Sequence, residues 1–166
     1  MTNRQSVPTR SDQRPKDYTS TVYGSVLTAT VIVSSGTSRS PVALAALVVV
    51  SGIVFWTAHV YAATVASVHG GWHLYSIRRG MAREWPVAAA AIPPAIAALV
   101  SALLPDISAA KVVWVALIVA IAEQQLWGLA AIRSARLTGT ALTRTVLLNL
   151  FMGLIIVALK LALPTH

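Results

Sequence analysis

The stretch VALAALVVVSGIVFWTAHVYAATVAS, residues 42–67, decides the fold class. It contains no Asp, Glu, Lys or Arg, and one histidine, His59. A helix needs about 20 apolar residues to cross a hydrocarbon core of about 30 Å. This stretch is longer than that, so it predicts a membrane-spanning helix.

Four further apolar stretches predict spans at about 20–36, 86–104, 110–131 and 144–163. The composition of the chain agrees, because 56% hydrophobic and 11% charged residues leave too little polar side chain to coat a water-soluble globule. We therefore predict an all-α integral membrane bundle of about five transmembrane helices in one domain, residues 20–166. The Pro93–Pro94 pair predicts a kink in the third span.

Two polar segments flank or interrupt the spans. Residues 1–19 combine four basic side chains with almost no apolar ones, which predicts a disordered basic tail. Residues 69–85 mix aromatic and basic side chains, which is typical of an interfacial connector that anchors helix ends at the headgroups. Its expected anchors are Trp72, Arg78, Arg79, Arg83 and Trp85.

The positive-inside rule predicts the orientation. With the N-terminus in the cytoplasm, the cytoplasmic segments hold Arg4, Arg10, Arg14, Lys16, Arg78, Arg79, Arg83, Arg133, Arg136 and Arg144. The opposite side holds Arg39, Lys111 and Lys160. This asymmetry predicts a multi-pass protein of the plasma (inner) membrane whose basic side chains meet anionic lipid headgroups, and it explains the charge of +8 without nucleic acid.

The first apolar stretch has an alternative interpretation. A basic tail, a short apolar run and small residues at 34–36 also describe a cleaved signal peptide, which would leave four helices. The long polar leader and the lack of an A-x-A-like site favour a retained helix.

Polar side chains inside the spans are the candidate functional residues, because ionisable groups there cost on the order of 3 kcal/mol. At about 1.5 Å per residue, His59, Glu123 and Asn149 lie within about 7 Å of their span centres, all on the cytoplasmic side. Tyr23 falls in the same half of the membrane. These four residues predict one polar layer, and no second acidic residue falls in the predicted spans.

This layer is compatible with two functions. In a small proton or cation permeation protein, Glu123 and His59 exchange protons or bind a cation along the path. In a non-catalytic accessory or scaffold subunit of a larger membrane complex, the same groups are interhelical hydrogen bonds. A bundle this small leaves little interior of its own, so we also expect self-association or a place in a larger complex.

Catalytic and cofactor signals are absent from the sequence. There is no cysteine, no phosphate loop, no dinucleotide fingerprint and no paired carboxylates. His69 and His73 have i, i+4 spacing, but glycines separate them and no carboxylate completes a metal site. We therefore expect neither an enzyme nor a bound cofactor or metal.

The strings VYGSVLTAT, FWTAHVYA and IIVALK together resemble a group of small uncharacterised bacterial polytopic membrane proteins. The resemblance would cover most of the membrane part and singles out Tyr23, Gly24, His59, Tyr61 and Lys160. It implies a helical membrane fold and no activity, and Glu123 lies outside these strings.

Overall fold

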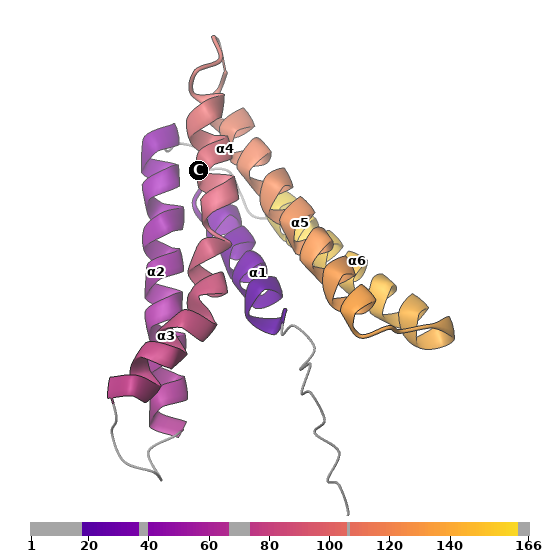
Figure 1. Cartoon of the computed structure of the whole chain (residues 1–166). Coiled ribbons are helices and arrows are strands. Elements are labelled where there is room, and N and C mark those ends of the chain that lie inside the picture. The colour runs from indigo at the N-terminus through magenta and orange to yellow at the C-terminus, as the bar shows by residue number, and fades with distance from the viewer. Residues whose placement is uncertain (1–17, 37–39, 67–73, 106, 163–166) are drawn as a thin grey trace, which may run out of the picture.

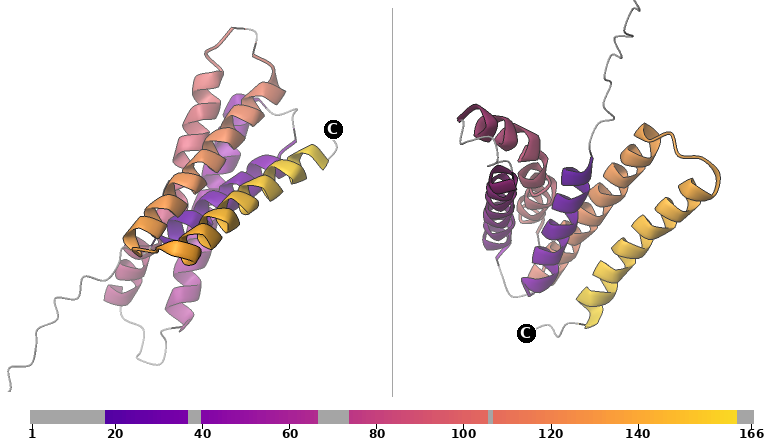
Figure 2. Two further views of the ribbon diagram at one scale, coloured as in Figure 1. Left: turned by 90° about the vertical axis from the view of Figure 1, so that its right-hand side faces the viewer. Right: turned by 90° about the horizontal axis from the view of Figure 1, so that it is seen from below.

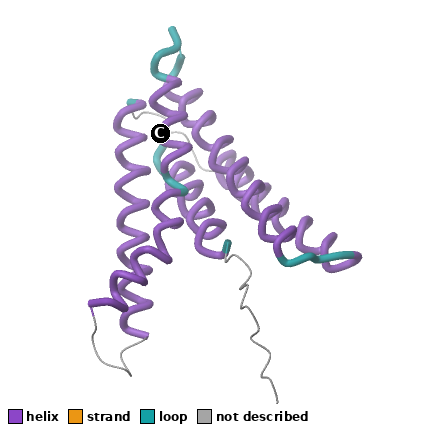
Figure 3. The backbone as a smooth tube through the Cα atoms, in the orientation of Figure 1, coloured by secondary structure: helices purple, strands orange, loops and turns teal. Residues whose placement is uncertain are grey.

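The computed structural model describes residues 18–36, 40–66, 74–105 and 107–162, which form six helices and no strand (Figure 3). The helices are α1 (Thr19–Ser34), α2 (Pro41–Ala66), α3 (Leu74–Ala89), α4 (Ile92–Ser101), α5 (Ala109–Ser134) and α6 (Gly139–Ala162) (Figure 1). Four apolar helical stretches are long enough to cross a membrane, and α1 is a shorter apolar helix. The predicted all-α membrane bundle is confirmed, and the chain is a multi-pass membrane protein.

The short helix α1 lies at the centre of the bundle. Its 16 residues reach about 24 Å, less than the hydrocarbon thickness of about 30 Å. It nevertheless packs against α2, α3, α5 and α6, and Ala29 and Ile32 are fully buried. Seen from below, α1 separates the α2–α3 side from the α5–α6 hairpin (Figure 2). Removal of the first apolar segment would therefore uncover the faces of α3 and α5 that pack on it.

The third span differs from its predicted range of 86–104. The structure has two consecutive helices here, and the apolar stretch runs from Gly80 to Ser101. The break at Ala90 and Ala91 follows from Pro93 and Pro94, which provide no N–H for the preceding turn and clash with its carbonyl groups. The predicted kink is present. The extension toward the N-terminus means that residues 74–85, expected in the connector, are helical.

The core lies where the helices converge, at the end opposite to the start of α1. It consists of small and branched side chains from α1, α2, α4, α5 and α6, including Ile32, Val48, Ala98, Leu117 and Ile156. At the other end α5 and α6 lean away from α2 and α3 (Figure 1). This splaying leaves space beside α1 that α6 only partly fills.

The turn between α5 and α6 closes the helical hairpin at this splayed end. Arg136 has a φ of 51°, in the left-handed region. Its N–H donates to the carbonyl of Arg133 at 3.2 Å, and the N–H of Leu137 donates to the carbonyl of Ile132 at 3.5 Å. This is the Schellman pattern of helix termination, here with Arg where Gly is usual. The turn brings Arg133 and Arg136 to the same end as Arg144.

Candidate binding groove

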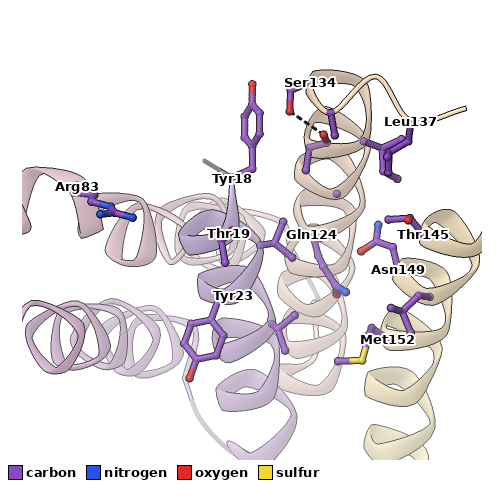
Figure 4. A pocket seen from close by; sticks show the side chains of 17 residues that line it. Tyr18, Thr19, Tyr23, Arg83, Gln124, Ser134, Leu137, Thr145, Asn149 and Met152 are labelled. Carbon is purple, nitrogen blue, oxygen red and sulfur yellow. Dashed lines mark hydrogen bonds between the residues drawn. The ribbon is translucent and has the colours of Figure 1, made fainter. Parts of the chain in front are cut away.

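A groove with a volume of about 1650 Å³ lies between α1, α5 and α6. Its walls are mostly apolar and include Val22 and Val26 on α1, Ile132 on α5, and Leu148 and Met152 on α6. Small-molecule sites commonly occupy about 300–1,000 Å³, so this space suits a larger or chain-like molecule. Tyr18, Ser134 and Leu137 lie at one end of the groove and Met152 lies deeper (Figure 4).

Gln124 is the buried polar residue of this groove. Its side chain is 1% exposed, and it points from α5 toward the α6 side of the groove (Figure 4). The Oε1 atom is buried without a hydrogen-bond partner among the described residues. Buried polar atoms are nearly always paired, and an unpaired one costs about 1–3 kcal/mol. The wall of the groove therefore contains an amide with an unsatisfied oxygen.

Asn149 and Gln125 connect the two helices of the hairpin. Asn149 Nδ2 donates to Gln125 Oε1 at 2.8 Å, and Gln125 Nε2 donates to the backbone carbonyl of Asn149 at 3.1 Å. Two glycines make room for this pair: a methyl group on Gly128 would overlap the Asn149 amide, and one on Gly153 would come within 2.9 Å of Gln125 Nε2. The pair is interhelical hydrogen bonding at a close helix contact.

Tyr23 and His59 meet on the other side of α1. Their ring centroids are 4.9 Å apart, and His59 Nδ1 lies 3.0 Å from the carbonyl oxygen of Phe55. A carbonyl only accepts, so Nδ1 is the donor in this contact. Tyr23 and Asn149 lie on opposite sides of α1 (Figure 4).

Glu123 stands apart from both pairs. Its Oε1 accepts a hydrogen bond from Trp127 Nε1 at 3.2 Å on the same helix, and Trp127 packs 5.9 Å from the Tyr18 ring. Its Oε2 is buried and has no hydrogen-bond partner in the part of the chain that the structure describes. Among the described residues, no hydrogen bond joins Glu123 to His59 or Asn149. Of the four residues expected in one polar layer, Tyr23 and His59 thus contact each other, Asn149 bonds to Gln125, and Glu123 contacts none of the other three, because the four lie on four different helices that are rotated differently.

Glu84 is a second acidic residue within an apolar helical stretch, which corrects the expectation that Glu123 is alone. It lies in the Gly80–Ser101 stretch, where Ser20 donates to its Oε2 at 2.8 Å and Arg83 Nε approaches Oε1 at 3.8 Å. The sequence placed Glu84 in the connector because the span was expected to begin at Pro86. Hydrogen bonding to Ser20 ties α3 to the start of α1.

Four of the expected interfacial anchors, Arg78, Arg79, Arg83 and Trp85, belong to α3. The side chains of Arg78 and Arg83 are exposed, and Trp85 is half-exposed with its ring edge-on to Trp56 at 5.7 Å. Trp56 Nε1 also donates to the carbonyl of Met81 at 3.1 Å. Trp72 lies outside the described residues, and of Arg79 only the backbone is described. These aromatic contacts fix α2 against α3.

Lys160 is buried, although its position near the end of the last span suggested a side chain reaching the membrane surface. It is 5% exposed, and Nζ donates to the carbonyl of Val33 at 3.3 Å, one residue before the end of α1. A cation suits the C-terminal end of a helix, whose carbonyls lack intrahelical partners. Lys160 therefore joins the C-terminal end of α6 to the C-terminal end of α1, whereas the Asn149 pair lies near the middle of α6.

Sequence reasoning assigned no role to Gln124 and Gln125. One signal was available, because Val113, Leu117, Ala120, Gln124 and Gly128 recur at helical spacing and form one buried stripe on α5. A glutamine that interrupts such a stripe has to face protein or a cavity.

Among the described residues, no group of His, Asp and Glu side chains is placed to hold a metal ion.

Comparison with protein-family models, curated proteins and solved structures gave no match. The resemblance carried by the segments around Tyr23, His59 and Lys160 therefore stays a prediction. Function has to be argued from the groove and the polar contacts themselves.

Proposed function

We propose that this chain is a non-catalytic, membrane-embedded binding subunit that holds a membrane-soluble molecule in the groove between α1, α5 and α6. The observation that carries the proposal is the unpaired, fully buried Gln124 in the wall of a large apolar groove. Ligand sites in proteins combine these two features, an apolar wall and a few placed polar groups. If a partner chain or the bound molecule covers the groove, the chain is an accessory subunit of a larger membrane complex.

The groove is more readily a binding site than a pore. Its inner end meets the packed layer that contains Ile32, Leu117 and Ile156, none of which is more than 5% exposed. An ion that followed the groove would have to cross this apolar layer without a polar partner, which is costly. A molecule with an apolar part needs no such crossing.

The orientation that we propose follows the charges at the two ends. Arg78, Arg83, Arg133, Arg136 and Arg144, here called the arginine-rich end, lie where α1 begins and α5 ends. The described basic residues toward the other end are Lys111 and the buried Lys160. We assign the arginine-rich end and the N-terminus to the cytoplasmic side of the plasma (inner) membrane.

Native mass spectrometry of protein extracted in mild detergent tests the binding function. A Trp at Met152, which lines the groove, should fill it and remove a bound molecule that the wild-type protein retains. Leu154→Trp is the matched control, because Leu154 is on the same helix, is 64% exposed and does not line the groove. Equal retention by both variants, or no bound molecule in any of them, would refute the proposal.

Proton or cation permeation is the second candidate, and the unpaired Oε2 of Glu123 favours it. A buried carboxylate oxygen without a donor is a place for a proton or cation, and intramembrane carboxylates commonly mark such paths. In this interpretation Tyr23, His59 and Asn149 supply further polar groups, either within one copy or between copies.

Flux measurements in liposomes test permeation. Glu123→Gln should abolish a proton or cation flux, whereas Glu84→Gln, at a carboxylate already hydrogen-bonded to Ser20, should leave most of it. Absence of flux with the wild-type protein would eliminate this candidate.

A further inference from the structure

We infer that the groove is a specific site for an anionic phospholipid, with the headgroup at the arginine-rich end and an acyl chain along the apolar wall. This inference rests on the proposed function, because it names the molecule that occupies the same groove. Three features of the groove support it: its length, the charge at its mouth and the order of groups along α6.

The groove has the depth of one membrane leaflet. From Tyr18 at its mouth to Val26 deeper along α1 the chain advances eight positions, or about 12 Å at 1.5 Å per residue. Half of a hydrocarbon core of about 30 Å is about 15 Å. The packed layer around Ile32 and Ile156 closes the deeper end. A space of this depth, blind at the membrane centre, fits the acyl chain of a lipid in one leaflet.

The mouth of the groove is positively charged. Arg133, Arg136 and Arg144 are exposed and adjoin the lining residues Ser134, Leu137 and Thr145. Among the described residues, no acidic side chain forms an ion pair with these three arginines and none lines the groove. Basic pockets between transmembrane helices bind anionic headgroups. The guanidinium group suits a phosphate in particular, because it offers several donors in one plane.

The part of α6 nearer the mouth of the groove carries polar groups, and the deepest lining residue is apolar. Thr145, which follows Arg144 in the sequence, lines the groove nearest its mouth. Asn149 lies about 6 Å deeper, next to Leu148 and with Gln124 in the facing wall, and Met152 lies deepest. Rotation of the Gln124 amide about its last torsion presents NH₂ in place of Oε1, so this group can donate to an ester carbonyl of the lipid.

Other occupants fit less well. A second copy placed by two-fold symmetry would bring two arginine-rich mouths of the same charge together, which is unfavourable. A wholly apolar molecule would leave the arginines and the Gln124 amide without partners. A zwitterionic lipid would add a cation next to the arginines. An anionic phospholipid offers a phosphate to the arginines, an ester to the Gln124 amide and an acyl chain to the apolar wall.

Lipid titration of the delipidated full-length protein tests the inference, with native mass spectrometry to count bound lipids. We expect phosphatidylglycerol to be retained in preference to phosphatidylcholine. Arg144→Gln should weaken phosphatidylglycerol binding about fivefold, since one arginine near anionic lipid is worth a factor of that size. Lys111→Gln, which removes an exposed charge near the opposite end, is the matched control and should have no effect.

Gln124→Leu separates the ester contact from the charge contact. It should weaken the binding of both lipids alike, because both contain the same esters, and it should leave the preference for phosphatidylglycerol unchanged. The thermal unfolding midpoint of each variant checks that the bundle is intact. If Gln124→Leu loses all lipid binding and also has a lowered unfolding midpoint, the loss is attributed to unfolding. Met152→Trp then replaces it as the variant that tests binding in the groove.

Three results would overturn the inference. Equal retention of both lipids by the wild-type protein refutes anionic selectivity but leaves the binding function in place. Phosphatidylglycerol binding that Met152→Trp does not reduce is general surface lipid and not a groove lipid. Absence of lipid binding, with a crosslink between two copies through Met152→Cys, assigns the groove to a second copy. If the protein extracted from membranes also retains no bound molecule, the proposed function fails as well.

Discussion

Single polar residues hold α6 in place. Near the middle of the helix Asn149 bonds to Gln125, and near its C-terminal end Lys160 donates to the carbonyl of Val33. Leu148 and Met152 of α6 border the groove, whereas Leu147 and Leu154 are large apolar side chains that point outward. In lipid there is little hydrophobic gain when helices associate, so directional hydrogen bonds carry more of the specificity than they do in water.

The Gln125–Asn149 pair should show an energetic coupling in a double-mutant cycle. We expect Gln125→Ala and Asn149→Ala to be coupled by about 0.6–2 kcal/mol, the range measured for interhelical hydrogen bonds in membranes. Reversible unfolding in mixed micelles, followed by circular dichroism, measures the four free energies of unfolding. Strictly additive effects would show that the two amides do not stabilise the hairpin together.

At the scale of the elements, close approach of helices depends on small residues. Gly24 on α1 faces the backbone of α3: a Cβ there would lie 2.8 Å from the carbonyl oxygen and 2.9 Å from the Cα of Val87. Backbone atoms cannot move aside as the end of a side chain can. The contact therefore fixes the distance between α1 and α3.

Gly24→Ala should destabilise the bundle by about 1–3 kcal/mol, as overpacking of a tight contact does. Gly80→Ala is the matched control, because nothing lies within 4 Å of a Cβ at Gly80 in the same bundle. It should be neutral or stabilise α3 by up to about 1 kcal/mol. The unfolding midpoints of the two variants test this prediction. A Gly24→Ala protein as stable as the wild type would show that α1 and α3 are not in tight contact at Gly24.

For the whole molecule, the arrangement of helix ends makes the proposed orientation testable. The chain has no cysteine, so a single introduced cysteine gives an unambiguous label. Thr138 lies between α5 and α6 and Leu104 between α4 and α5, at opposite ends of the bundle, and both are exposed.

In intact cells a membrane-impermeant maleimide should label Leu104→Cys and leave Thr138→Cys unlabelled until the membrane is opened. The physical reason is the excess of arginines at the Thr138 end, which retains that end in the cytoplasm. The opposite pattern would reverse the orientation. Labelling of both positions in intact cells would show that α5 does not cross the membrane.

The amino-acid sequence by itself determined the membrane class, the helical content and the approximate spans, because lipid solvation depends on the length and hydropathy of each local segment. The kink before Pro93 was predictable for the same local reason. The start of the third span was not, since the connector residues before Pro86 also favour a helix and extend α3.

Only the tertiary structure decided which polar groups meet. The depth of a residue in the membrane follows from its position along the helix, and this depth is similar for His59, Glu123 and Asn149. The direction in which each side chain points depends on how its helix is rotated and which helix lies beside it. That rotation pairs Tyr23 with His59, turns Asn149 toward Gln125, and leaves Gln124 facing a groove that exists because α6 packs beside α5 and only partly against α1.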